Sequence, residues 1–198
     1  MTPRTTWRAR SRSASPRCVG VLLAAGAGRR YGKPKVLVPG WLDAAVGALR
    51  DGGCTQVVLV LGAAEVTPPP GVTAVVAEHW QQGLSASVRA GLEQAERSGG
   101  EYAVLHVIDT PDVGAAVVAR VLSRAVRAQS GLARAYFDAR PGHPVVVARQ
   151  HWPALLASLS GDSGAAAFLR GRTDLVMVQC GDLADGHDID EPHPHHPG

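Results

Sequence analysis

The feature that most constrains this chain is a glycine-rich segment placed directly after its first apolar run. Residues 18–25 are continuously apolar, which predicts a strand buried on both faces of a parallel sheet. Residues 26–35 follow as Gly-Ala-Gly-Arg-Arg-Tyr-Gly-Lys-Pro-Lys. The glycines permit a tight loop whose N–H groups converge on an anion, and the basic side chains would stabilise a polyphosphate. The segment fits neither the P-loop pattern nor G-x-G-x-x-G.

The rest of the chain alternates strand and helix patterns. Strands are expected at 18–25, 56–62, 72–77 and 102–108, and helices at 41–52, 84–98 and 114–128. Paired strands around a turn at Arg140–His143, two helices and a strand are expected next, at 132–137, 144–149, 151–159, 163–170 and 175–178. This order predicts an α/β fold: a Rossmann-like, three-layer α/β/α domain with a mostly parallel sheet. Ligands of such sheets bind at the carboxyl ends of the strands.

Length and composition indicate one domain at 17–191, between a disordered basic tail at 1–16 and a flexible His/Pro tail at 192–198. Five of the 20 basic residues are arginines within the first 17 positions, so the remaining 15 face 17 acids. The domain itself therefore lacks the basic surface of a nucleic-acid-binding protein. No apolar run is long enough to span a membrane. Three scattered cysteines fit a reducing compartment, so we expect a cytoplasmic protein.

The first loop also carries a family resemblance. Leu23–Lys35 reads L-A-A-G-x-G-x-R-x-G-x-x-K and resembles the signature of the MobA-like NTP transferases, which include molybdenum cofactor cytidylyl- and guanylyltransferases. The resemblance implies a fold of the nucleotide-diphospho-sugar transferase type and a loop that wraps a triphosphate. It assigns phosphate contacts in catalysis to Arg30 and Lys35. It assigns nucleotide binding to Leu23, Ala24, Ala25, Gly26, Ala27 and Gly28. The chain's only lysines, Lys33 and Lys35, both lie in this loop.

Acidic residues near two predicted strand ends are the candidate metal ligands. Asp109 follows the strand at 102–108, and Mg²⁺ favours one or two carboxylates plus phosphate oxygens. The resemblance makes Asp109 catalytic and metal-binding, and it makes Asp190, with Asp188 as second choice, the other metal ligand. The family's usual G-D-Q-P is altered to Ile-Asp-Thr-Pro here. The alternatives are a turn or helix-capping role for Asp109, for which Asp112 is the better cap, and an acidic tail for Asp188 and Asp190.

Three further segments resemble substrate-binding parts of the family. Residues 80–92 resemble a segment that borders the nucleobase, so Ser85 and Ser87 are expected to bind base or ribose, unless they only cap a helix. His143 lies in G-H-P-V and is expected on the acceptor side, unless it is a solvated turn residue. Asp162 lies in a segment similar to G-D-x-G-A-R and is expected to contact substrate, unless it caps the next helix. Ala166 stands where that family segment has Arg.

Together these patterns predict a Mg²⁺-dependent nucleotidyltransferase. It would move a nucleoside monophosphate from an NTP to a small phosphorylated acceptor such as molybdopterin and release pyrophosphate, with CTP favoured and GTP the alternative. A guanylyl- or sugar-phosphate nucleotidyltransferase is the rival within the class. A catalytically inactive nucleotide-binding chaperone or regulatory protein is the rival outside it. A monomer or weak homodimer is expected, with a molybdoenzyme apoprotein or its chaperone as the protein partner.

Overall fold

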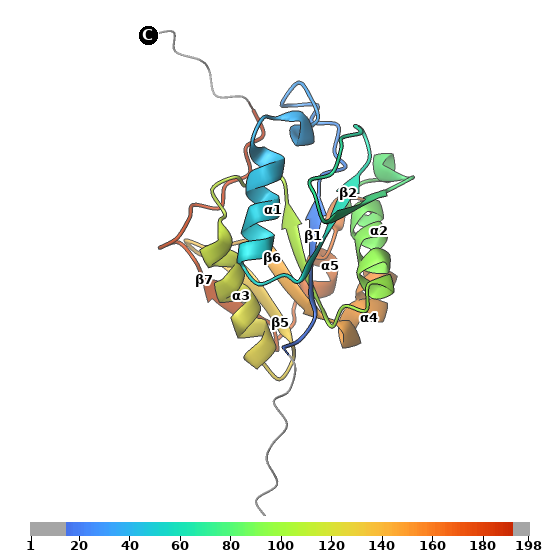
Figure 1. Ribbon diagram of the computed structural model, residues 1–198. Coiled ribbons are helices and arrows are strands. Elements are labelled where there is room, and N and C mark those ends of the chain that lie inside the picture. The colour runs from blue at the N-terminus through green and yellow to red at the C-terminus, as the bar shows by residue number, and fades with distance from the viewer. Residues whose placement is uncertain (1–14, 192–198) are drawn as a thin grey trace, which may run out of the picture.

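A seven-stranded sheet forms the centre of the protein in a computed structural model that describes residues 15–191 (Figure 1). The strand order is β3-β2-β1-β4-β6-β5-β7. The bounds are β1 Cys18–Leu23, β2 Gln56–Leu61, β3 Val72–Val76, β4 Tyr102–Val107, β5 Leu132–Phe137, β6 Arg140–Ala148 and β7 Val176–Gln179. Only β6 runs antiparallel to its neighbours in this sheet, which confirms the mostly parallel arrangement. Positions 1–14 and 192–198, on which most of the two predicted tails fall, lie outside the described residues.

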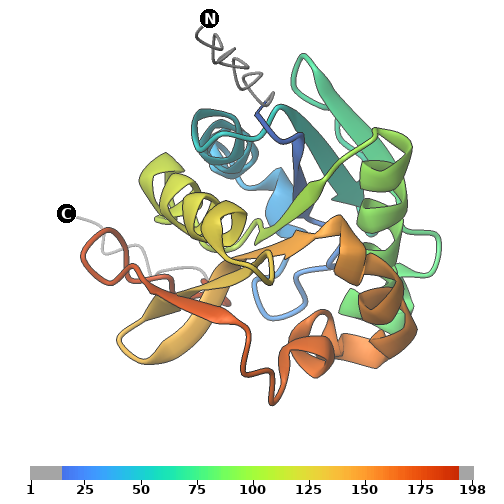
Figure 2. The same cartoon turned by 90° about the horizontal axis from the view of Figure 1, so that it is seen from below.

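Helices cover both faces of the sheet and make the three predicted layers (Figures 1 and 2). Their bounds are α1 Trp41–Asp51, α2 Leu84–Arg97, α3 Ala115–Arg127, α4 Trp152–Ser158 and α5 Ala166–Leu169. One apolar cluster joins α1 and α3 to Leu22 of β1, and a second joins α2 and α4 to Val21 of the same strand. Both faces of β1 are therefore buried, which explains why its sequence is apolar at every position. None of the helices in the described part combines the length and the apolar character that a membrane crossing requires.

Three local expectations differ from the structure. The β5–β6 turn lies at Asp138 and Ala139, which both have positive φ, so β6 already begins at Arg140. The helix expected at 163–170 is confined to α5, because Gly164, at φ 48°, interrupts it. Asp112 does not cap α3, whose N-cap is Gly114; its carboxylate instead accepts the backbone N–H groups of residues 185 and 186.

His106 is a buried histidine in β4 that leaves both ring nitrogens without a hydrogen-bond partner among the described residues. Burial and the neighbouring His143 lower its pKa to about 3. An unfolded histidine titrates near pH 6.5, so between about pH 6.5 and 3 the unfolded chain binds the extra proton. This histidine therefore contributes a loss of stability as the pH falls through that window.

We expect His106→Leu to flatten the pH dependence of the free energy of unfolding, by up to ~1.4 kcal/mol per pH unit between pH 6 and 4. Leucine is apolar and similar in size, so it removes the titration without opening a large cavity. Urea unfolding of both proteins at several pH values measures the difference. Parallel pH profiles for the two proteins would contradict the buried, neutral state of His106.

Candidate active site

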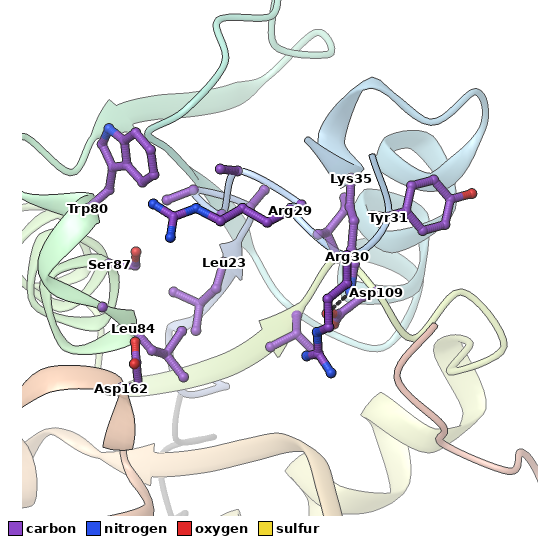
Figure 3. A pocket seen from close by; sticks show the side chains of 18 of the residues that line it. Leu23, Arg29, Arg30, Tyr31, Lys35, Trp80, Leu84, Ser87, Asp109 and Asp162 are labelled. Carbon is purple, nitrogen blue, oxygen red and sulfur yellow. Dashed lines mark hydrogen bonds and ion pairs between the residues drawn. The ribbon is translucent and has the colours of Figure 1, made fainter. Parts of the chain in front are cut away.

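A cavity of about 550 Å³ opens at the carboxyl ends of β1 and β4, beside the start of α2 (Figure 3). Open α/β sheets bind their ligands in the crevice outside the carboxyl ends of the strands. The cavity has two chemically different ends. Lys35, Arg30 and Asp109 lie at one end, whereas Trp80, Ser87 and Asp162 lie at the other, with Arg29 between them.

The glycine-rich loop forms the wall above β1. Its backbone closes on itself where the Gly32 N–H donates to the Gly28 carbonyl at 2.8 Å. Gly28 has φ 60°, and a β-carbon there would collide with the backbone carbonyl of Lys33. Only glycine fits this position, which keeps the loop tight where residues 24–28 line the cavity.

Two carboxylates from distant segments converge on the ammonium of Lys35. The Lys35 Nζ lies 2.9 Å from Asp109 Oδ2 and 3.0 Å from Asp190 Oδ1. Arg30 reaches the other oxygen of Asp190 at 2.9 Å. Burial disfavours the charge on Lys35, but its hydrogen bonds to the two carboxylates outweigh burial and raise its pKa. The loop cations and the acids therefore pair with one another and neutralise their charges.

The segment carrying Asp188 and Asp190 is held beside the carboxyl end of β4 by hydrogen bonds that its backbone N–H groups donate. The Ile189 N–H donates to the Asp109 carbonyl at 2.9 Å. Asp112 anchors the preceding turn through the N–H groups of Asp185 and Gly186. Burial, followed by the negative charges of Asp109 and Asp190, raises the pKa of Asp188. Asp109, Asp188 and Asp190 thus lie close together near the carboxyl end of β4, although Asp188 does not line the cavity.

The opposite end of the cavity combines aromatic, apolar and hydrogen-bonding groups. Ser87 of α2 is only 4% exposed and lines the cavity beside Leu84. Trp80 comes from the short helix η2, Trp80–Gln82, and Asp162 from η4, Gly161–Ser163. Gly83 has φ 110°, and a β-carbon there would collide with the Asp162 carboxylate. This glycine therefore allows η4 to approach the start of α2.

Most of the residues selected from the sequence meet in this cavity. It is lined by Leu23, Ala24, Ala25, Gly26, Ala27, Gly28, Arg30, Lys35, Ser87, Asp109, Asp162 and Asp190. Ser85, His143 and Asp188 do not line it. α2 begins at Leu84 after Gly83, so neither serine is the cap residue of that helix.

His143 lies in β6, outside the cavity lining. Its Nδ1 is 3.3 Å from the Leu105 carbonyl, which can only accept, so Nδ1 carries the proton. Burial and the nearby positive charge of Arg134 lower the pKa of His143. A neutral ring in this tautomer offers Nε2 as an acceptor, which is a poor partner for a phosphate.

Sequence reasoning missed Arg29, Tyr31, Trp80, Gln81 and Leu84 as cavity-lining residues. Trp80 and Gln81 belong to the segment 80–92 already selected for its serines, of which Ser87 lines the cavity and Ser85 does not, so the segment itself was the signal. Arg29 adjoins Arg30, and nothing in the local pattern distinguishes which of the two faces the acids.

The acidic end fits a divalent cation that arrives together with phosphate groups. Asp109 Oδ2 and Asp190 Oδ1 point at one cation position, now taken by the Lys35 ammonium. Within residues 15–191, no group of three or more His, Cys, Asp or Glu side chains could hold a metal ion. Two carboxylates leave coordination positions for phosphate oxygens and water, which is the set that Mg²⁺ favours.

Comparison with known proteins places the chain in a family. A family model for the MobA-like NTP transferase domain matches residues 20–177. This chain belongs to the MobA-like NTP transferase family. The match includes the glycine-rich loop, Asp109 and Asp162, and family membership makes the chain a nucleotidyltransferase.

Three similar proteins illustrate the range of this family and fold. The chain is 35% identical to nicotine blue oxidoreductase of Paenarthrobacter nicotinovorans, over 88% of this chain and 93% of that protein. It superposes on Rv0371c of Mycobacterium tuberculosis H37Rv with TM-score 0.73 and 26% identity, covering 90% and 95% of the two chains. A nucleotidyl transferase from Methanothermobacter shares the fold, with TM-score 0.71 and 21% identity over 89% and 93% of the chains.

Proposed function

We propose that this protein transfers a nucleoside monophosphate, with CMP favoured, from an NTP to a small phosphorylated acceptor such as molybdopterin. The observation that carries the proposal is the convergence of Lys35, Asp109 and Asp190 next to the glycine-rich loop. The loop and its cations suit a triphosphate, and the two acids suit a divalent ion. A manganese complex of Rv0371c, 27% identical at TM-score 0.66 over 83% and 88% of the two chains, supports the choice of a divalent cofactor.

In the proposed reaction, an oxygen of the acceptor phosphate attacks the α-phosphorus of the NTP. The bond from that phosphorus to the bridging oxygen breaks, and pyrophosphate leaves with the electron pair. Lys35 and Arg30 exchange their carboxylate partners for phosphate oxygens and hold the triphosphate in line. Asp109 and Asp190, released from Lys35, would hold Mg²⁺, which neutralises charge on the transferring and leaving phosphates. Positioning and charge account for the catalysis, since no covalent intermediate is needed.

The base is proposed to occupy the end formed by Trp80, Ser87 and Asp162. A nucleotide whose triphosphate lies at the loop would extend its base toward this end. Trp80 offers an aromatic surface, and the Asp162 carboxylate accepts hydrogen bonds from an exocyclic amino group such as that of cytosine. Uridine presents a carbonyl at the same ring position, which the carboxylate would repel.

We expect pyrophosphate release to require an NTP, Mg²⁺ and a phosphorylated acceptor together, and to be fastest with CTP. The assay incubates the protein with each of the common NTPs, pyrophosphatase and candidate acceptors, molybdopterin included, and measures phosphate. Nucleotide binding without pyrophosphate release under any condition would favour the inactive chaperone or regulatory protein. Release of pyrophosphate with sugar phosphates but not with molybdopterin would identify a sugar phosphate, and not molybdopterin, as the acceptor.

Reduction of a dye-like compound is a second candidate, favoured by the 35% identity to nicotine blue oxidoreductase over 88% of this chain. A loop that holds a triphosphate also suits the pyrophosphate of a nicotinamide dinucleotide, which would supply the hydride. The near-ultraviolet absorbance of NADH or NADPH, followed with nicotine blue present, tests this activity. A decrease that persists in EDTA would establish it apart from nucleotidyl transfer.

A further inference from the structure

The sheet face that carries Arg134 continues from the floor of the cavity. Arg134 of β5 pairs with Val145 of β6, and Val145 pairs with Leu105 of β4. Paired residues on neighbouring strands point to the same face of a sheet. Leu105 and Val145 pack in the apolar cluster beneath α2, and Val107, two residues along β4, lines the cavity. Arg134 therefore lies on the cavity side, about 10 Å across the sheet from β4.

The Arg134 side chain leans toward the edge where the acids meet. Its Nε donates to the Gly142 carbonyl at 3.0 Å. Gly142 lies near the start of β6, and β6 runs antiparallel to β4, so it begins at the edge where β4 ends. After burial, the charge of Arg134 is the main cause of the lowered pKa of His143, whereas Asp109 acts on the same ring in the opposite direction. Arg134 and Asp109 thus both influence one histidine.

Arg134 is a half-buried cation without an acidic partner in the described chain. No carboxylate among residues 15–191 lies within ion-pair distance of it, in contrast to Arg120, Arg149 and Arg172. Burial lowers the pKa of its guanidinium. Removing an unpaired guanidinium from water costs free energy. An anionic ligand that accepts hydrogen bonds from the two Nη groups of Arg134 would offset this cost.

The part of this face between Arg134 and β7 is open to a ligand, whereas Val145, the partner of Arg134 on β6, is buried. Tyr136 is half-buried, and the paired positions Met177 and Gln179 on β7 are exposed, Met177 by 60%. The opposite face of the same strands packs under α3 through Ala133, Ala135 and Phe137. In Figure 2 the β5–β6 hairpin projects away from α4 and α5. Only one of the two faces is therefore available.

We infer that this face is the acceptor subsite, with Arg134 binding a phosphate monoester of the acceptor and Tyr136 and Met177 contacting its apolar part. The inference rests on the proposed nucleotidyl transfer, because that reaction needs a second anionic substrate beside Asp109. Arg134 supplies a forked, permanently charged donor, which a neutral His143 does not. The subsite accordingly selects for negative charge, and its outer, exposed part tolerates acceptors of different size.

Phenyl phosphate is the probe that tests this subsite, with and without Mg²⁺ and a non-hydrolysable CTP analogue that fills the cavity. We expect it to bind in both conditions and to shift the backbone amide signals of Gly142, Tyr136 and Met177. Arg134→Gln should raise its Kd at least about tenfold, and Arg134→Lys by less, because a bidentate contact is lost. The matched control is Arg124→Gln, an exposed arginine of α3 on the opposite face, which should leave the Kd unchanged.

Equal Kd values for Arg134→Gln and the unaltered protein would overturn the inference, as would absence of phenyl phosphate binding or signal shifts confined to residues 26–35. If Arg134→Gln unfolds, the amide shifts of the unaltered protein decide the question alone. Failure of the proposed function looks different: the CTP analogue does not bind and no pyrophosphate appears, while phenyl phosphate still binds in an Arg134-dependent way.

Discussion

Asp109→Asn is expected to lower the rate of pyrophosphate release by about 10³-fold, as losing several kcal/mol of transition-state stabilisation implies. Asparagine keeps the shape of the side chain but removes the charge that would bind the divalent ion. The fold should survive, since the Asp109 side chain is 24% exposed and the bond from the Ile189 N–H uses the Asp109 backbone carbonyl. Steady-state kinetics, Mn²⁺ affinity and the melting temperature measure the three effects separately.

Asp182→Asn is the matched control for that experiment. Asp182 also pairs with a basic side chain, that of Arg120 of α3, but it does not line the cavity. Its substitution should leave turnover and Mn²⁺ affinity unchanged. If Asp109→Asn retains more than about a tenth of the unaltered rate, Asp109 is not the metal ligand of the reaction.

Lys35→Met is expected to act in opposite directions on the metal and on the nucleotide. Without nucleotide, Mn²⁺ should bind about tenfold more tightly, because the ammonium now 2.9 and 3.0 Å from the two carboxylates no longer competes for their oxygens. With CTP, the loss of a phosphate contact should reduce kcat/KM by about 10²–10³-fold. Electron paramagnetic resonance of free Mn²⁺ and steady-state kinetics record the two effects.

Lys33→Met provides the control with the same charge change in the same loop. Lys33 is exposed and does not line the cavity, so neither Mn²⁺ affinity nor kcat/KM should change appreciably. Weaker Mn²⁺ binding by Lys35→Met in the absence of nucleotide would refute the competition between lysine and metal. That result would mean that Lys35 organises the two acids for the ion instead of excluding it.

The sequence by itself determined the order of strands and helices and the nature of the first loop. β1 is apolar throughout because both of its faces are covered, and this pattern is legible without a structure. The tight loop after β1 could also be predicted, because its glycines allow positive φ values such as the one that Gly28 adopts. Asp109 could be placed near the loop because the ends of parallel strands meet at one edge.

Only the tertiary structure decided which distant groups meet. Lys35 and Asp190 are separated by 155 positions. The resemblance selected Asp190, but only the structure shows that Asp112 holds the preceding turn through the N–H groups of residues 185 and 186. Arg134 looked like an ordinary strand residue until the pairing of β5 with β6 and β7 placed it on the cavity face. The local sequence determines whether a segment forms a helix, a strand or a loop. Which segments lie next to it depends on the order and register of the strands, and these are set by burial of the whole sheet between its helices.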